Sequence, residues 1–331
     1  MRALIILIIW FGAELDQLAA QKLKVLATAS MWKDIAEQIG GPFVQVDLIV
    51  PIGSDPHSYE PTPDDLFKVN EAQLIFVNGL SFEGWLDKLI RNSSAKHTQV
   101  LITKGVDALS NPDHPGAYDP HAWMTASNGA IYAQNIANAL VTFDPAHSKE
   151  YQFNAGVYIK QLEDLDKYIL QQIQRIPAEH RVLVTSHDAF HYYGLRYGLE
   201  LHSLLGTSTD ADVQAGDLIS INALIKKRAI PAIFTESTVN PKLIQSIREE
   251  NSISIGGSLY ADSLGDEKSP ASDYQKMLRH NTDVIVRALT GSVTFTHQEK
   301  LLSPTAIYSS LIGIYLLLFY AFFYLAKSQK N

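Results

Sequence analysis

One long helical segment near the middle of the chain limits the folds that are open to it. The stretch PAHSKEYQFNAGVYIKQLEDLDKYILQQIQRI, residues 145–176, is built largely from good helix formers and has no proline after its first residue. Its apolar residues recur at spacings of three and four, which is the period of a helix with one buried face. A helix of about 30 residues is roughly 45 Å long, which is more than one α/β lobe needs. The segment therefore predicts a helix that links two lobes.

Short apolar runs alternate with helical patterns on both sides of this segment. Before it, KLKVLAT (22–28), VQVDLIV (44–50) and QLIFVNG (73–79) are typical of strands separated by helices. After it, RVLVTS (181–186) and PAIFTES (231–237) continue the alternation. Such alternation predicts an α/β fold. The predicted domains are an N-terminal α/β lobe over 21–143, the linking helix over 144–176 and a C-terminal α/β lobe over 177–298.

The N-terminus carries a short apolar segment. Arg2 precedes an apolar run over residues 3–11, which is too short to span a bilayer comfortably. Ala19 and Ala20 supply small residues for cleavage, so residues 1–20 are predicted to be a signal peptide that exports the protein.

The C-terminus carries a longer apolar segment. Residues 305–326 are uncharged and rich in Leu, Ile, Phe and Tyr, which predicts a transmembrane helix. Lys327 and Lys330 follow it and favour a cytoplasmic C-terminus. The two ends together predict a membrane-anchored protein on the periplasmic or extracellular side of the cytoplasmic membrane.

Composition excludes several kinds of site. The 331 residues include no cysteine, so disulfides, thiolate metal sites, a cysteine nucleophile and a lipid anchor on an N-terminal cysteine are all ruled out. The formal net charge of −8 and the absence of a basic stripe argue against a nucleic-acid partner.

Four metal-binding side chains stand where an α/β fold presents its functional residues, in loops at strand ends. His57 lies in the loop GSDPHSYEP, His121 in DPHAWM, His187 directly after the strand RVLVTS, and Asp262 in GGSLYADSLG after the last strand. Two of these residues belong to each predicted lobe, so all four could converge between the lobes. Three neutral imidazoles and one carboxylate suit a divalent transition metal, whereas calcium and magnesium prefer mostly oxygen ligands.

Other interpretations of the histidine in TSHDAFHYYG are weaker. Ser186, His187 and Asp188 are adjacent, and a catalytic triad is assembled from separated parts of a fold. We expect Asp188 to cap the following helix. His191 lies four residues after His187 and could form a ligand pair with it on a helix, although an exposed or core position is the simpler expectation.

Taken together and in order, the motifs resemble those of one known family. GSDPHSYEPTPDD, DPHAWM, TSHDAFHYYG, IPAIFTEST and GGSLYADSLG are similar to motifs of the metal-binding solute-binding proteins of bacterial ABC importers, in the zinc, manganese and iron branch. The resemblance covers roughly residues 22–289. It implies two lobes joined by a long helix, with the metal held between them. It also implies that His57, His121, His187 and Asp262 are the ligands.

The resemblance further implies a binding protein without catalytic residues that delivers its metal to a membrane permease. Nothing in the sequence demands a dimer, so we expect a monomer. Three imidazoles favour zinc over manganese or iron, although other motifs look more like the manganese branch. Glu236, in TEST, is either a partner of a ligand imidazole or a carboxylate at a helix start.

Two other functions stay open at this point. If Asp262 did not bind the metal, water could take the fourth position, as in a zinc hydrolase. A surface adhesin would also be compatible with the predicted anchor.

Overall fold

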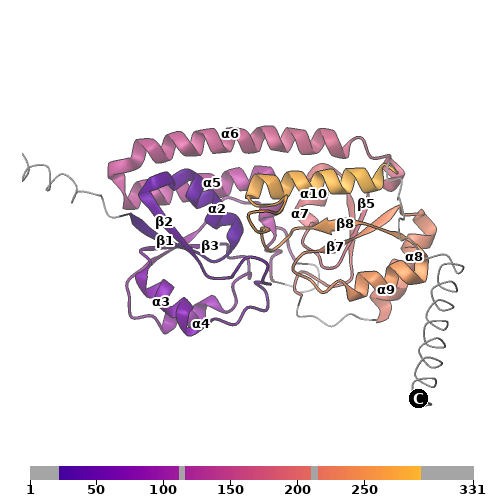
Figure 1. The fold of residues 1–331 in the computed structure, drawn as a ribbon, viewed down its shortest axis with the longest axis horizontal. Helices are drawn as coiled ribbons and strands as arrows, with labels where there is room; N and C mark the ends of the chain where they lie inside the picture. The colour runs from indigo at the N-terminus through magenta and orange to yellow at the C-terminus, as the bar shows by residue number, and fades with distance from the viewer. Residues whose placement is uncertain (1–21, 112–115, 210–214, 292–331) are drawn as a thin grey trace, which may run out of the picture. The chain divides into compact units, whose positions relative to one another are not determined.

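The computed structural model describes residues 22–111, 116–209 and 215–291. Within these residues the chain forms two α/β lobes, and one long helix runs along both of them (Figure 1). The predicted signal peptide, residues 1–20, lies outside the described residues.

The first lobe is built on a four-stranded parallel sheet with the strand order β2-β1-β3-β4. Its central strand β1 is buried along most of its length, as expected for a parallel sheet that helices cover. The helix after β2 begins with a capping box, because the Asp65 carboxylate accepts from the Thr62 amide at 2.8 Å. The elements are β1 (Leu23–Ala27), α2 (Ser30–Gly40), η1 (Gly41–Phe43), β2 (Val44–Leu48), α3 (Pro63–Glu71), β3 (Leu74–Val77), α4 (Leu86–Arg91), β4 (Thr98–Leu101), η2 (Ala122–Met124), α5 (Ala126–Phe143) and η3 (Pro145–His147).

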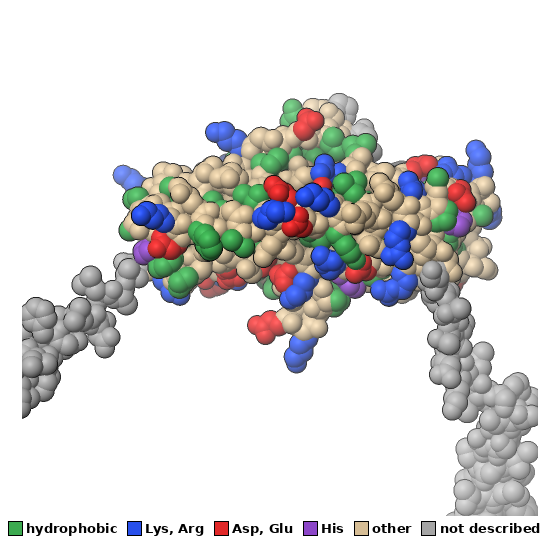
Figure 2. Space-filling model, turned by 90° about the horizontal axis from the view of Figure 1, so that it is seen from above, with side chains coloured by type: hydrophobic (Ala, Val, Ile, Leu, Met, Phe, Trp, Pro, Cys, Tyr) green, Lys and Arg blue, Asp and Glu red, His purple; other side chains and the backbone are tan. Residues whose placement is uncertain are grey.

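The long helix is α6, Ser148–Ile173, with 26 residues. Its buried side chains, from Tyr151 to Ile173, recur at helical spacing and face α2, α5 and α10. Its outer face carries charges of both signs, interspersed with apolar groups (Figure 2). One ion pair on this helix joins Lys160 and Asp164 at 2.6 Å. Helix α6 therefore packs along one stripe against elements of both lobes.

The second lobe contains two parallel strand pairs, β5-β6 and β7-β8, and β5 contacts β7. Its apolar core lies between these strands and helices α8 and α9, and it includes Val184, Ile225, Ile233 and Ile247. The elements are η4 (Ala178–His180), β5 (Val182–Thr185), α7 (His191–Tyr197), β6 (Glu200–Ser203), α8 (Ala215–Arg228), β7 (Ala232–Glu236), α9 (Lys242–Asn251), β8 (Ser254–Leu259) and α10 (Tyr274–Leu289).

The predicted fold class needs one correction. No helix in the described ranges is long and apolar enough to cross a membrane. The two longest described helices are too polar to cross a membrane, because α5 carries asparagine and glutamine side chains and α6 carries charged ones. The predicted transmembrane helix, residues 305–326, lies outside the described ranges. The fold class is therefore restated as two α/β lobes joined by one long helix.

The first turn of α10, in the second lobe, packs tightly on the first lobe. The Tyr274 amide donates to Asp34 at 3.0 Å, and its hydroxyl donates to the carbonyl oxygen of Trp123. Gly129 of α5 allows this approach, because a Cβ atom there would lie 2.5 Å from the Tyr274 hydroxyl.

We expect Gly129→Ala to lower the free energy of unfolding by about 1–2 kcal/mol, because overpacking outweighs the gain in helix propensity. Gly156→Ala in α6 is the matched control, since nothing lies within 4 Å of its Cβ position. We expect that change to raise the same free energy by about 0.5–1 kcal/mol. Urea denaturation of both variants measures the difference, and equal stabilisation would contradict the close contact.

Candidate metal centre

The structure brings the four predicted ligands together from both lobes. His57 follows β2, and His121 lies directly before η2 in the first lobe. His187 follows β5 and Asp262 follows β8 in the second lobe. One ligand atom from each residue lies within 4.8 Å of the other three. The loops at the carboxyl ends of strands therefore meet at one point between the lobes, as in other α/β proteins.

The spacing of these atoms suits a small four-coordinate cation. His57 Nε2 lies 3.2 Å from His121 Nε2, and His121 Nε2 lies 3.5 Å from Asp262 Oδ1. His187 Nε2 lies 3.1 Å from Asp262 Oδ2, and His57 Nε2 lies 3.9 Å from Asp262 Oδ1. Bonds of about 2.0–2.1 Å to a tetrahedral zinc ion place its ligands about 3.3 Å apart. The distances above, 3.1–3.9 Å between neighbouring ligand atoms, bracket that value.

Burial makes a cation the natural partner of these groups. His121 and His187 are 0% exposed and Asp262 is 1% exposed. The Asp262 oxygens face imidazoles of the same cluster, with His187 Nε2 3.1 Å from Oδ2 and His121 Nε2 3.5 Å from Oδ1. A buried carboxylate needs a compensating charge. A bound divalent ion would supply it once these imidazoles have lost their protons.

Two further carboxylates orient the imidazoles from behind. Asp119 Oδ1 accepts from the His121 amide at 2.9 Å and lies 2.8 Å from His121 Nδ1. Glu236 Oε1 accepts from the His187 amide at 2.8 Å, and its Oε2 lies 2.6 Å from His187 Nδ1. Each carboxylate thereby favours the tautomer that leaves Nε2 free to bind a metal. Glu236 thus contacts the imidazole of a predicted ligand, as expected for the first of its two suggested roles.

Sequence reasoning missed Asp119, although its position was a usable signal. It lies two residues before His121 in the motif DPH. An Asp side chain readily accepts from the backbone amide two residues on, and here the same oxygen also reaches the imidazole. His57 has a similar local contact, because Asp55 Oδ1 accepts from the His57 amide at 2.9 Å.

The electrostatics of the site divide the ligands into two kinds. Burial lowers the pKa of His57 to about 4, and the other two imidazoles add to the effect, against the attraction of nearby carboxylates. Burial alone would raise the pKa of Asp262, but the three imidazoles lower it well below its usual range. His57 is therefore neutral and Asp262 ionised near neutral pH.

The other two imidazoles behave in the opposite way. Burial alone would lower the pKa of His121, but hydrogen bonds to Asp119 and Asp262 outweigh it and raise the pKa to about 9. In the same way Glu236 and Asp262 raise the pKa of His187 well above its usual range. A cation that binds here must displace protons from both imidazoles.

Asp188, the neighbour of His187, does not have the role that the sequence predicted for it. Helix α7 begins at His191 after Phe190, with no side-chain cap, so the prediction that Asp188 caps it was wrong. The chain turns tightly at His187 before the helix starts, and Asp188 instead lines a surface pocket of about 360 Å³. His191 lies outside the four-residue cluster, and its Nδ1 is 3.7 Å from Asp119 Oδ2.

Fold and site together define a class of protein. Two α/β lobes are joined by one long helix, and three imidazoles and a carboxylate from the two lobes converge between them. The carboxylate of Asp262 occupies the fourth position of the cluster, which in a hydrolytic zinc site is taken by water. This arrangement defines a two-lobed metal-binding protein.

Comparison with known proteins gives the family. The family described as zinc-uptake complex component A, periplasmic (ZnuA), matches residues 25–288. This match spans most of the chain. The chain therefore belongs to the ZnuA family, the metal-binding periplasmic solute-binding proteins of ABC transporters. Proteins of this kind bind and hand over a metal and are not enzymes.

Individual relatives agree over nearly their whole length. The manganese ABC transporter substrate-binding lipoprotein PsaA of Streptococcus anginosus is 33% identical over 283 residues, which cover 83% of this chain and 92% of that protein. The periplasmic zinc-binding protein TroA of Treponema pallidum has a TM-score of 0.77 and 31% identity, covering 81% of this chain and 99% of that one. The Mn-bound periplasmic metal-binding protein of Candidatus Liberibacter asiaticus has a TM-score of 0.75 and 30% identity, covering 81% and 100%.

Proposed function

We propose that this chain captures one divalent transition metal outside the cytoplasmic membrane and delivers it to the permease of an ABC importer. In this proposal the metal binds to His57, His121, His187 and Asp262. The observation that supports it best is the convergence of four ligand atoms, from both lobes, within 4.8 Å of one another, three of them on buried residues. A site formed by both lobes ties metal binding to the contact between them.

Zinc is the metal that the donor atoms favour. Three imidazole nitrogens and one carboxylate form a tetrahedral set that zinc accepts readily, whereas manganese prefers oxygen-rich octahedral sites. The names of the relatives point in both directions, since PsaA is described as a manganese protein and TroA as a zinc-binding one. Manganese is therefore the second candidate, and iron is a third that nitrogen and oxygen donors also accept.

A competition experiment between zinc and manganese tests this proposal. The purified chain, first freed of metal with a chelator, is offered equimolar zinc and manganese, desalted and analysed by elemental mass spectrometry. We expect one equivalent of zinc, lost in His187→Ala and kept in His202→Ala. His202 is the matched control, because it pairs with Glu200 in the same lobe and lies outside the cluster.

The other results are equally informative. Retention of one equivalent of manganese would support the carrier function but identify manganese as its metal. No retained metal, or equal loss in both histidine variants, would contradict the proposal.

A further inference from the structure

The base of a hairpin in the first lobe, residues 109–111 and 117–119, contacts the second lobe beside the metal centre. Ser110 and Tyr118 form an antiparallel bridge, and the Asp119 amide donates to the Leu109 carbonyl at 2.9 Å. The Asn111 side chain donates to Thr207 Oγ1 of the second lobe, and both residues are buried. The base of this hairpin ends at Asp119, two residues before the ligand His121.

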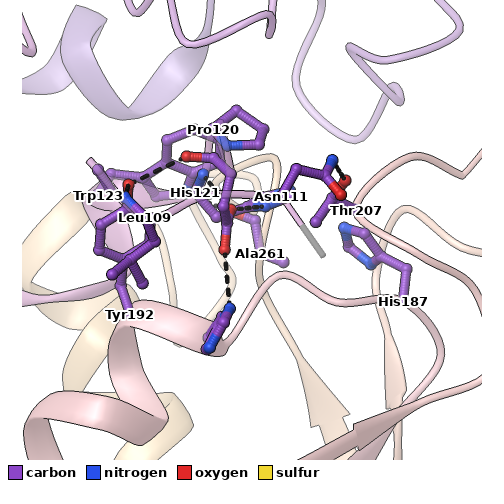
Figure 3. A network of polar contacts seen from close by, with 12 residues as sticks. Leu109, Asn111, Pro120, His121, Trp123, His187, Tyr192, Thr207 and Ala261 are labelled. Carbon is purple, nitrogen blue, oxygen red and sulfur yellow. Dashed lines mark hydrogen bonds and ion pairs between the residues drawn. The ribbon is translucent and has the colours of Figure 1, made fainter. Parts of the chain in front are cut away.

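One hydroxyl of the second lobe joins the two strands of the hairpin at its base. Tyr192 lies in the first turn of α7 and is 5% exposed. Its hydroxyl accepts from the Leu109 amide at 3.0 Å and donates to the Asp119 carbonyl at 3.1 Å. Figure 3 shows Tyr192, Leu109 and His121 in this network. The hydroxyl therefore uses both its donor and its acceptor capacity on the first lobe.

The chain of contacts continues to the metal ligand. The Asp119 carboxylate, held through its own backbone by Tyr192, accepts from the His121 amide and contacts its Nδ1. The residue before Tyr192 in α7, His191, lies 3.7 Å from the other oxygen of the same carboxylate. The first turn of α7 thus contacts Asp119 from two directions.

We propose that Tyr192 is a positioning residue that couples the contact between the lobes to the geometry of the ligand His121. This inference rests on the proposed function, because it concerns how the captured metal is held and released. While the lobes are in contact, Tyr192 fixes Asp119, and Asp119 fixes the imidazole. When the second lobe moves away, both hydrogen bonds break and His121 loses its support, so the metal leaves faster.

The same helix offers matched controls for a test. Tyr193 is buried, and its hydroxyl pairs with Thr282 Oγ1 at 2.8 Å within the second lobe. Tyr197 is also buried, and its hydroxyl accepts from the Ala126 amide of the first lobe at 3.2 Å and donates to Asp166 at 2.8 Å. Tyr→Phe at each position removes one buried hydroxyl, but only Tyr192→Phe removes the contacts with Asp119.

The experiment uses the full chain loaded with Co²⁺, whose visible absorption reports the ligand field. Loss of an outer partner of a metal ligand typically changes affinity about 10–100-fold. We therefore expect Tyr192→Phe to release Co²⁺ to excess EDTA roughly tenfold faster or more, with a shifted visible spectrum. Tyr193→Phe and Tyr197→Phe should keep the wild-type spectrum and nearly the wild-type rate, and circular dichroism checks that each variant is folded.

The outcomes separate this inference from the proposed function. A wild-type rate and spectrum in Tyr192→Phe would overturn the positioning role. Equal acceleration in all three variants would overturn it as well, because it would show general loosening. Failure of the wild-type chain to bind Co²⁺, zinc or manganese would instead contradict the proposed function.

Discussion

Asp262→Asn is expected to abolish tight metal binding while the fold persists. The substitution keeps the shape of the side chain but removes the one negative charge among the four ligands. Loss of one charge from a buried pair costs about 3–5 kcal/mol, which corresponds to a roughly 100- to 5,000-fold loss of affinity. Isothermal titration calorimetry with zinc measures the change.

Asp266→Asn is the control for this variant, because Asp266 is an exposed residue of the same loop. We expect it to bind zinc as the wild type does. An affinity within a factor of three of the wild type in Asp262→Asn would show that this carboxylate is not a ligand. A zinc site would then need a different fourth ligand.

Metal binding near neutral pH is expected to release two protons. The pKa of His121 is about 9 and that of His187 is raised well above its usual range, so both imidazoles are protonated in the metal-free protein at pH 7. His57, with a pKa of about 4, is already neutral at that pH and releases no net proton. The metal takes Nε2 of each imidazole, so one proton leaves His121 and one leaves His187.

The sign of the pH dependence follows from these protons. Between about pH 4 and pH 9 each rise of one pH unit removes competition from two protons, so the apparent affinity should rise about 100-fold per unit. The loss on acidification therefore starts well above the ordinary range of imidazole. Calorimetry in buffers of different ionisation enthalpy counts the protons. Release of three protons, or of none, at pH 7 would contradict the assigned protonation states.

The clustering of the four predicted ligands could be anticipated because most of them follow a general rule. His57, His187 and Asp262 each follow a strand, and the carboxyl ends of parallel strands are where α/β proteins place functional residues. The helical period of residues 145–176 likewise indicated α6, whose observed bounds are Ser148–Ile173. These features depend on local patterns that one sequence contains.

Other features depend on contacts between distant segments. Asp119 meets an imidazole only because the DPH turn brings its carboxylate under the ring. Tyr192 meets Leu109, 83 residues away in the sequence, and no period or motif records that pairing. The cap expected from Asp188 failed because the chain turns first and starts α7 at His191. The choice between zinc and manganese also depends on the spacing of the ligands, which the types of the four residues do not specify.

The position of the bound metal tests the central claim most directly. Crystals of the zinc-loaded protein, measured at the zinc absorption edge, give an anomalous peak wherever the ion lies. We predict one peak about 2.0–2.2 Å from Nε2 of His57, His121 and His187 and from a carboxylate oxygen of Asp262. A peak elsewhere, or no peak in a fully loaded crystal, would contradict the claim that these four residues hold the metal.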